Sequence, residues 1–177
     1  MLPILLALAV VVILLIVFVA GQPDEFKLVR ETKISVPREK IFPHVNDLRA
    51  WEAWSPWAKL DPNAKNSFEG PAAGIGAAMS WSGNKKIGEG RMTITESCAN
   101  ELIGFRLDFV RPFKATNTAE FVFRPEGNQT RVTWSMSGKS NFFFKIFGLL
   151  MNCEKMAGKD FEKGLASLRA VVETSKS

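Results

Sequence analysis

Tyrosine is absent from this sequence of 177 residues, although phenylalanine occurs 14 times and tryptophan five times. The phenol that often orients a polar ligand or donates a proton is therefore unavailable. Histidine occurs once, as His44, so neither a histidine metal cluster nor a Ser-His-acid triad is indicated. We predict no metal, no cofactor and no catalytic residue, and we leave enzymatic activity undecided.

Cysteine is scarce, and basic residues are not concentrated in any one stretch. Cys98 and Cys153 are too few for a disulfide framework, and we expect two part-buried thiols. The absence of a dense Lys/Arg run argues against a nucleic-acid partner. The net charge of +5 and the pI of about 9.4 are compatible with attraction to acidic lipid headgroups.

Residues 2–20 form an unbroken apolar run without a charged side chain. At about 1.5 Å per residue, a helix of this length can cross a hydrocarbon core about 30 Å thick. A cleaved signal peptide is the alternative, but no Lys or Arg precedes the run, and cleavage after Ala20 would put Phe18 where a small residue is needed. We therefore predict a single-pass membrane anchor over residues 1–21 and a linker over residues 22–25.

The basic residues that follow the run bear on its orientation. Lys27, Arg30, Lys33, Arg38 and Lys40 come soon after it, and basic flanks tend to stay in the cytoplasm. This favours a cytoplasmic domain.

Beyond the linker the pattern alternates with a period of two for most of the chain. The first strand is expected over residues 26–36, and a helical pattern follows, which Pro43 should kink or split. After the helical segment about six antiparallel strands are expected, with turns near residues 82–86, 98–100 and 125–128. The glycines at 70, 74 and 76 indicate a turn, because no Lys-Ser/Thr of a phosphate-binding loop follows them.

A helix is predicted over residues 153–173, because Phe161, Leu165, Leu168 and Val172 recur at helical spacing on one face. We expect this helix to lie across a curved sheet and to close an apolar pocket. Two glycines at 158 and 164 each weaken the helix by about 1 kcal/mol, so a close approach of backbone or ligand is the expected reason for them.

The inner face of the sheet is predicted to be large, aromatic and rich in methionine, which suits varied apolar partners.

Trp51, Trp54 and Trp57 form either a hydrophobic plug or the lip of a pocket, and both interpretations stay open. Residues 141–151 resemble a short apolar helix that is buried, gates the pocket or touches the bilayer. The candidate ligand-binding residues, with Asn117 the clearest polar group among them, are Trp54, Trp57, Met79, Trp81, Met92, Ile94, Phe105, Leu107, Phe109, Asn117, Phe121, Phe123, Trp134, Met136, Phe147, Met151, Phe161 and Leu165.

Several stretches together resemble a known superfamily. They are residues 34–42 (ISVPREKIF), 51–62, 81–84 (WSGN), 88–94, 132–134 (VTW) and 158–165 (GKDFEKGL). The chain is similar to the START-like, or SRPBCC, superfamily and within it to the polyketide cyclase/dehydrase-like, lipid-transport group. The resemblance implies an α+β helix-grip fold over residues 26–175, in which a curved antiparallel sheet wraps on a long C-terminal helix.

Three functions are compatible with these observations. The first is a membrane-tethered binding or carrier module for an apolar small molecule, such as a lipid, a quinone or a polyketide-like compound, held between the sheet and the C-terminal helix. The second is a polyketide cyclase or dehydratase that uses the same cavity. The third is a ligand-free interaction domain at the membrane. The sequence identifies no protein partner.

Overall fold

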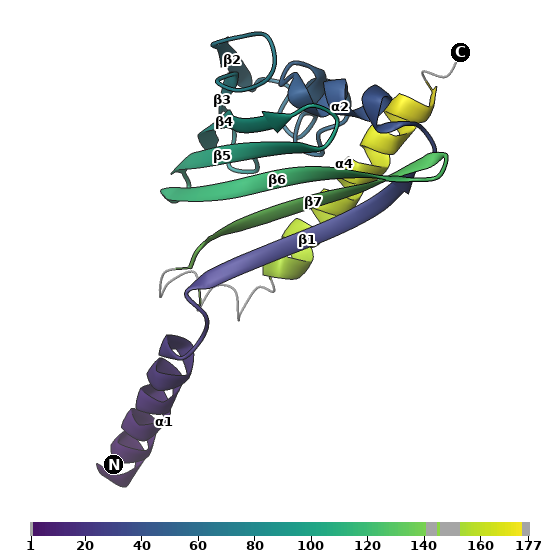
Figure 1. Ribbon diagram of the computed structural model, residues 1–177. Helices are drawn as coiled ribbons and strands as arrows, with labels where there is room; N and C mark the ends of the chain where they lie inside the picture. Colours follow the sequence, from purple (N-terminus) through teal and green to yellow (C-terminus); the bar gives the residue numbers. More distant parts are fainter. Residues whose placement is uncertain (1, 141–144, 146–152, 175–177) are drawn as a thin grey trace.

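The computed structural model describes residues 2–140, 145 and 153–174, without the side chains of residues 2, 5–8, 11, 12, 153 and 154. One antiparallel sheet of seven strands dominates it, in the order β1-β7-β6-β5-β4-β3-β2. Figure 1 shows the sheet curving so that helix α4 lies across one of its faces, which we call the inner face. The strands are β1 (Glu25–Ile34), β2 (Lys65–Glu69), β3 (Ala78–Ser82), β4 (Glu89–Cys98), β5 (Leu102–Arg111), β6 (Ala115–Glu126) and β7 (Gln129–Lys139).

The helices occupy both ends of the chain and the connection after β1. They are α1 (Leu2–Ala20), α2 (Arg38–Asn46), the short 3-10 helix η1 (Ala50–Ala53) and α4 (Cys153–Thr174). The amphipathic stripe predicted for α4 is buried, with Phe161, Leu165, Leu168 and Val172 at most 2% exposed. The alternating strands and this single apolar helix face explain the fold, because each buries its apolar side against the other. The antiparallel sheet and the C-terminal helix are therefore confirmed.

Strand register aligns inner-face residues into rows that run across the sheet. One row joins Met79, Met92, Leu107, Asn117 and, at the far side, Gly138, which pairs with Phe26. Side chains in one row are direct neighbours, so a row behaves as one continuous strip of surface.

The two glycines of α4 lie where other parts of the chain approach the helix closely. A Cβ at Gly164 would lie 2.8 Å from Cζ3 of Trp134 and 3.0 Å from Cδ of Pro56. A Cβ at Gly158 would meet the guanidinium of Arg30. The expected close approach is thus confirmed, and the approaching groups are protein side chains.

One part of the Pro43 prediction and the prediction for Cys98 are wrong. Pro43 does not split its helix, because α2 continues from Arg38 to Asn46 with Pro43 inside it. Pro43 lacks only its own N–H bond to the preceding turn, and its carbonyl still accepts the N–H of Asp47 at the end of the helix. Cys98 is exposed and not part-buried, since it ends β4 beside a turn. Cys153 falls in α4, and its side chain lies outside the described set.

Helix α1 extends away from the sheet as a separate rod (Figure 1). Nearly all of its described large side chains are exposed, and Val19 near its end is buried. A search of the described residues finds no helix with the length and hydropathy needed to cross a membrane.

Candidate functional site

The inner face divides into two parts that differ in how completely they are covered. We call the first the closed half, which contains the buried candidates Trp54, Ile94, Phe105, Phe121, Phe123, Trp134, Phe161 and Leu165. We call the second the open half, which contains Met79, Trp81, Leu107, Phe109, Asn117 and Met136. Met92, which is buried, lies between the two.

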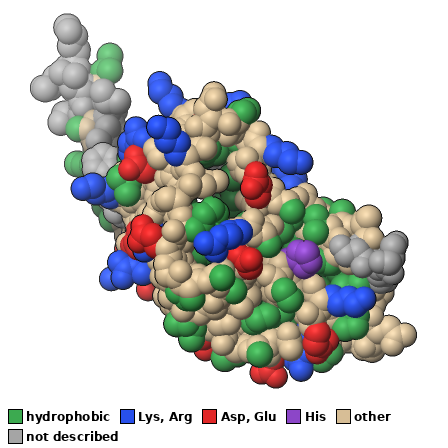
Figure 2. Space-filling view, turned by 90° about the horizontal axis from the view of Figure 1, so that it is seen from above, with side chains coloured by type: hydrophobic (Ala, Val, Ile, Leu, Met, Phe, Trp, Pro, Cys, Tyr) green, Lys and Arg blue, Asp and Glu red, His purple; other side chains and the backbone are tan. Residues whose placement is uncertain are grey.

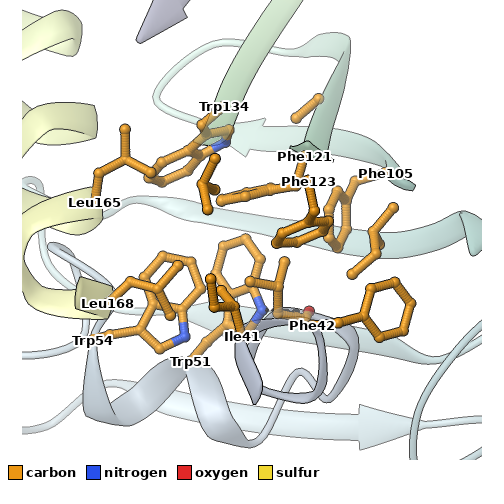
Figure 3. Packing of buried hydrophobic residues seen from close by; sticks show 14 of the residues in the cluster. Ile41, Phe42, Trp51, Trp54, Phe105, Phe121, Phe123, Trp134, Leu165 and Leu168 are labelled. Atoms are coloured by element: carbon orange, nitrogen blue, oxygen red, sulfur yellow. Dashed lines mark hydrogen bonds between the residues drawn. The ribbon is translucent and has the colours of Figure 1, made fainter. Parts of the chain in front are cut away.

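Aromatic rings fill the closed half. Trp134 stacks on Phe161 of α4 with ring centroids 3.9 Å apart and on Phe121 with centroids 4.8 Å apart. Figure 3 shows Trp51 and Trp54 facing these rings from the layer of α2 and η1. Such offset and edge-on contacts leave little room between large side chains. The closed half is therefore a packed core that supports the inner face.

The indole N–H groups of Trp51 and Trp54 are used inside the protein. Trp51 donates to the Val45 carbonyl and Trp54 to the His44 carbonyl, each at 2.9 Å. Both rings lie in the core cluster, as a hydrophobic plug would. Trp57 differs, because it is half-buried and touches Trp134 and Phe161 only at its edge, with centroids 5.8 and 6.2 Å away.

The open half keeps five large apolar side chains partly exposed. Met79, Trp81, Leu107 and Met136 pack against the core on one side and are accessible on the other. Phe109 joins them through an edge-on contact with Trp81 at 5.8 Å. Exposed apolar side chains are common singly, but a contiguous group on a concave face is typical of a binding site.

Two glycines let side chains of the open half lie flat on the sheet. Trp81 covers Gly90, where a Cβ would meet its ring, and its indole N–H donates to the Ile87 carbonyl at 3.1 Å. The amide of Asn117 occupies the equivalent space over Gly138. Their positions are therefore fixed by the sheet, so the open half is preorganised.

Asn117 is the polar group of the open half and is only 9% exposed. Within the described part of the chain, its amide forms no side-chain hydrogen bond. Among the described residues, no buried side-chain nitrogen or oxygen lacks a hydrogen-bond partner, so the amide is not an orphaned group and keeps access to solvent. A carboxamide offers two donors and one acceptor, so a ligand with one carbonyl or hydroxyl can bond to it.

The charged groups near the open half lie on the other face of the sheet. Asp108 is held by Arg106, with Nε to Oδ2 at 2.9 Å, and by the Thr116 hydroxyl at 2.7 Å. These hydrogen bonds keep the pKa of Asp108 below its usual value, so it stays ionised at neutral pH. No titratable side chain belongs to the open half. Among the described residues, no group of three or more His, Cys, Asp or Glu could hold a metal ion.

Two of the surface hollows in the described part of the chain have volumes of about 420 and 440 Å³. The first is lined by residues 108–110 and 114–116, at the rim of the open half, and includes Phe109. The second lies beside α2 and includes His44, which is in the last turn of that helix. Neither hollow has a lining residue from α4.

Two of the candidates cannot be placed. Phe147 and Met151, with the apolar segment 141–151 around them, lie outside the described residues apart from Lys145. Arg30 of the inner face was not among the candidates. Arg30 shares the parity of Leu28, and its Nε donates to Glu162 of α4 at 2.8 Å. The sequence did hold a signal for this contact, because a charged residue at an inward position of β1 needs a charged partner on the element that covers it.

Comparison with known proteins places this geometry in a family. A model described as polyketide cyclase/dehydrase and lipid transport matches residues 25–173. The chain belongs to the polyketide cyclase/dehydrase and lipid transport family. The family match spans the whole sheet and nearly all of α4, and so it includes both halves of the inner face. No curated protein sequence matches the chain.

Solved structures share the fold at low sequence identity. Protein MLL2253 from Mesorhizobium loti has a TM-score of 0.64 at 15% identity, over 86% of this chain and 100% of that one. Protein CV1439 from Chromobacterium violaceum has a TM-score of 0.59 at 16% identity, over 86% and 99%. The Aha1 dimer from Colwellia psychrerythraea has a TM-score of 0.60 at 16% identity, over 86% and 99%. At these identities the likeness shows the fold alone.

Proposed function

We propose that the domain binds one apolar small molecule, such as a lipid, a quinone or a polyketide-like compound, on the open half, and carries or presents it at a membrane. The observation that carries this proposal is the set of five half-exposed apolar side chains around the Asn117 amide. The family's description, which includes lipid transport, supports it. The lack of a titratable side chain in the open half favours binding over general acid–base chemistry.

The energetics favour a ligand of lipid size. Burial of apolar surface contributes about 25 cal/mol per Å², so roughly 400 Å² contributes about 10 kcal/mol. Association costs of about 4–15 kcal/mol offset much of this gain. A small aromatic compound would therefore bind weakly, whereas a long apolar chain that covers the whole open half would be retained. Asn117 would then fix its orientation through a single polar group.

Helix α1 is proposed as the membrane tether. The proposal rests on the sequence of residues 2–20, which holds no charged side chain, and on the exposure of Ile13, Leu15 and Val17, at 59%, 59% and 63%. An apolar surface of this kind on a free rod favours lipid over water. The cytoplasmic side is proposed for the domain from the basic residues after the helix.

Copurification tests the ligand proposal. The full chain is purified in mild detergent, and its bound compounds are extracted with organic solvent and identified by mass spectrometry. We expect a compound that is retained by the wild type and lost in Leu107→Glu, because a carboxylate on the open half would have to be desolvated against the ligand. The matched control is Val29→Glu, at a 40% exposed position on the outer face of β1, which should retain the compound.

Lipids that adhere only to α1 would copurify equally with all three proteins. Equal recovery from the wild type, Leu107→Glu and Val29→Glu would therefore contradict binding on the open half. Circular dichroism of each variant checks that the sheet is intact.

The tether is tested separately by alkaline carbonate extraction of membranes. The full chain should stay with the membrane fraction, and an Ile13→Asp/Ile16→Asp variant should be released, since each buried carboxylate costs several kcal/mol in the bilayer. Release of the unaltered chain would contradict the tether. A reporter fused at the C-terminus determines the side on which the domain lies.

A further inference from the structure

The two ends of the sheet differ in position and in charge. We call the end where α1 joins β1 the near end; it also carries the β3–β4 turn (83–88) and the β5–β6 turn (112–114). The opposite, far end carries the connections 70–77, 99–101 and 127–128. The strand register confirms this assignment. Phe26 at the start of β1 lies in the same row as Leu107 in the second half of β5, so the end of β5 lies on the same side of the sheet as the start of β1.

The open half lies toward the near end. Its row through Asn117 ends at Phe26, the second residue of β1, and Phe109 pairs with Ala115 one row closer to the edge. The closed half lies toward the far end, beneath α2 and the later turns of α4. The open half therefore lies toward the end of the sheet at which α1 joins β1, as the ends of the strands in Figure 1 show.

Basic residues gather at the near end. Lys85, Lys86 and Lys114 lie in its turns and are exposed, and Lys139 ends β7 beside the start of β1. Two of the acidic groups there have basic partners: Asp24 pairs with Lys145 at 2.6 Å, and Glu89 pairs with Arg111 at 2.7 Å. Figure 2 shows Lys and Arg side chains around the base of α1.

The far end has no comparable group of lysines in its connections 70–77, 99–101 and 127–128. The glutamates that these connections carry or adjoin are in ion pairs, Glu69 with Arg91, Glu101 with Arg38 and Glu126 with Arg131, and the loop 70–77 has no charged residue. The charge difference between the ends is therefore a property of the turns and not of the whole domain.

The near end also exposes apolar side chains beside its lysines. Phe113 is 58% exposed in the β5–β6 turn, and Val110 is 46% exposed just before it. Surfaces that enter the headgroup region of a bilayer typically combine aromatic and aliphatic side chains with flanking lysines.

We propose that the near end docks on an anionic lipid bilayer, with Val110 and Phe113 entering the interface and Lys85, Lys86 and Lys114 contacting acidic headgroups. This proposal rests on the proposed function, because α1 supplies the tether that brings the near end to the surface. Strand spacing of about 4.8 Å puts the 112–114 turn roughly 12 Å, and the 83–88 turn roughly 22 Å, across the sheet from β1. The open half would then face the bilayer and exchange its apolar ligand with it directly.

A fluorescent label tests the docking. The full chain with Cys98→Ser, Cys153→Ser and Phe113→Cys is labelled with the apolar dye NBD and reconstituted in nanodiscs of phosphatidylcholine, with or without 30% phosphatidylglycerol. We expect emission to rise at least about twofold in the anionic nanodiscs, as the dye leaves water for the interface. The rise should disappear in 1 M salt, where the Debye length falls to about 3 Å.

The matched control places the dye at Ile75→Cys, which is 63% exposed on the uncharged connection at the far end. Its emission should not depend on lipid charge. A second variant, Lys85→Glu/Lys86→Glu/Lys114→Glu, should abolish the rise at position 113 without releasing the chain from the nanodisc.

The outcomes separate the two proposals. A chain absent from the nanodisc fraction overturns the tether. A chain that is present in the nanodisc, with the dye at 113 in water or responding as the dye at 75 does, overturns the docking and leaves the ligand proposal standing. An equal rise in neutral and anionic nanodiscs overturns recognition of anionic lipid.

Discussion

At the scale of single residues, Asn117 is the side chain on which ligand recognition depends. It lies over Gly138 among apolar neighbours, and its amide has no side-chain partner in the described part of the chain. The amide offers two donors and one acceptor to a molecule on the open half, and the proposed ligand supplies a partner for them.

Replacing Asn117 should separate binding from stability. We expect Asn117→Leu to unfold at a temperature equal to or above that of the wild type, because an apolar group of similar size replaces an amide that forms no side-chain hydrogen bond within the described residues. Ligand retention should fall about tenfold, which corresponds to the loss of one hydrogen bond of about 1.4 kcal/mol. Thermal unfolding and quantitative extraction measure the two effects. A strong loss of stability would instead assign the amide a structural role.

Glu173 should make stability depend on pH. Its carboxylate accepts a hydrogen bond from the backbone N–H of Ser35 at 2.7 Å, and this bond, with Arg169 nearby, lowers the pKa of Glu173 below the ordinary value of a glutamate. A lowered pKa means that the stabilisation is present above about pH 4.5 and is lost as the pH falls through the folded-state value. Glu173→Gln should therefore show a smaller drop in Tm between pH 6 and pH 3 than the wild type. Identical pH profiles would contradict this role.

At the scale of elements, α4 and its contact with the sheet decide how far the inner face is closed. The sequence predicted the helix and its buried stripe because a 3.6-residue period needs only local information. It also predicted which strand residues face inward. It could not predict that Trp51 and Trp54 complete the core while Trp57 stays at its edge, because that depends on how α2 and η1 pack against β6 and α4. Strand β2 is exposed at every position and so had no alternating pattern to find.

The two glycines of α4 give a matched pair of substitutions. Gly164→Ala gains about 1 kcal/mol of helix propensity but forces a methyl group against Trp134 and Pro56, and such overpacking costs about 1–3 kcal/mol. We expect a lower Tm. Gly158→Ala meets only the flexible end of Arg30, which can move, so its Tm should be unchanged or higher. Differential scanning calorimetry distinguishes the two. Equal stabilisation by both would show that α4 does not press on Trp134.

At the scale of the whole molecule, the domain combines a packed half with an accessible half. The rings around Trp134 hold α4 on the sheet, and the accessible rows lie at the end that joins α1. This division could not be predicted from the sequence. The alternation along each strand shows which residues face inward, but residues of both halves face inward and so have the same pattern. Which rows are covered depends on where the helix crosses the sheet, and that is a long-range property. The methionines, expected as adaptable apolar surface, fall on both sides of the boundary: Met79 and Met136 are half-exposed and Met92 is buried.

Methyl NMR of the full chain labelled with ¹³C-methyl methionine tests the central claim most directly. The spectrum of the delipidated protein is compared with that after the extracted compound is added back, with assignments from single Met→Leu variants. The account predicts that the methyl resonances of Met79 and Met136 shift, whereas that of Met156, which is 56% exposed on α4, does not. Unchanged Met79 and Met136 resonances in the presence of bound compound would contradict binding on the open half.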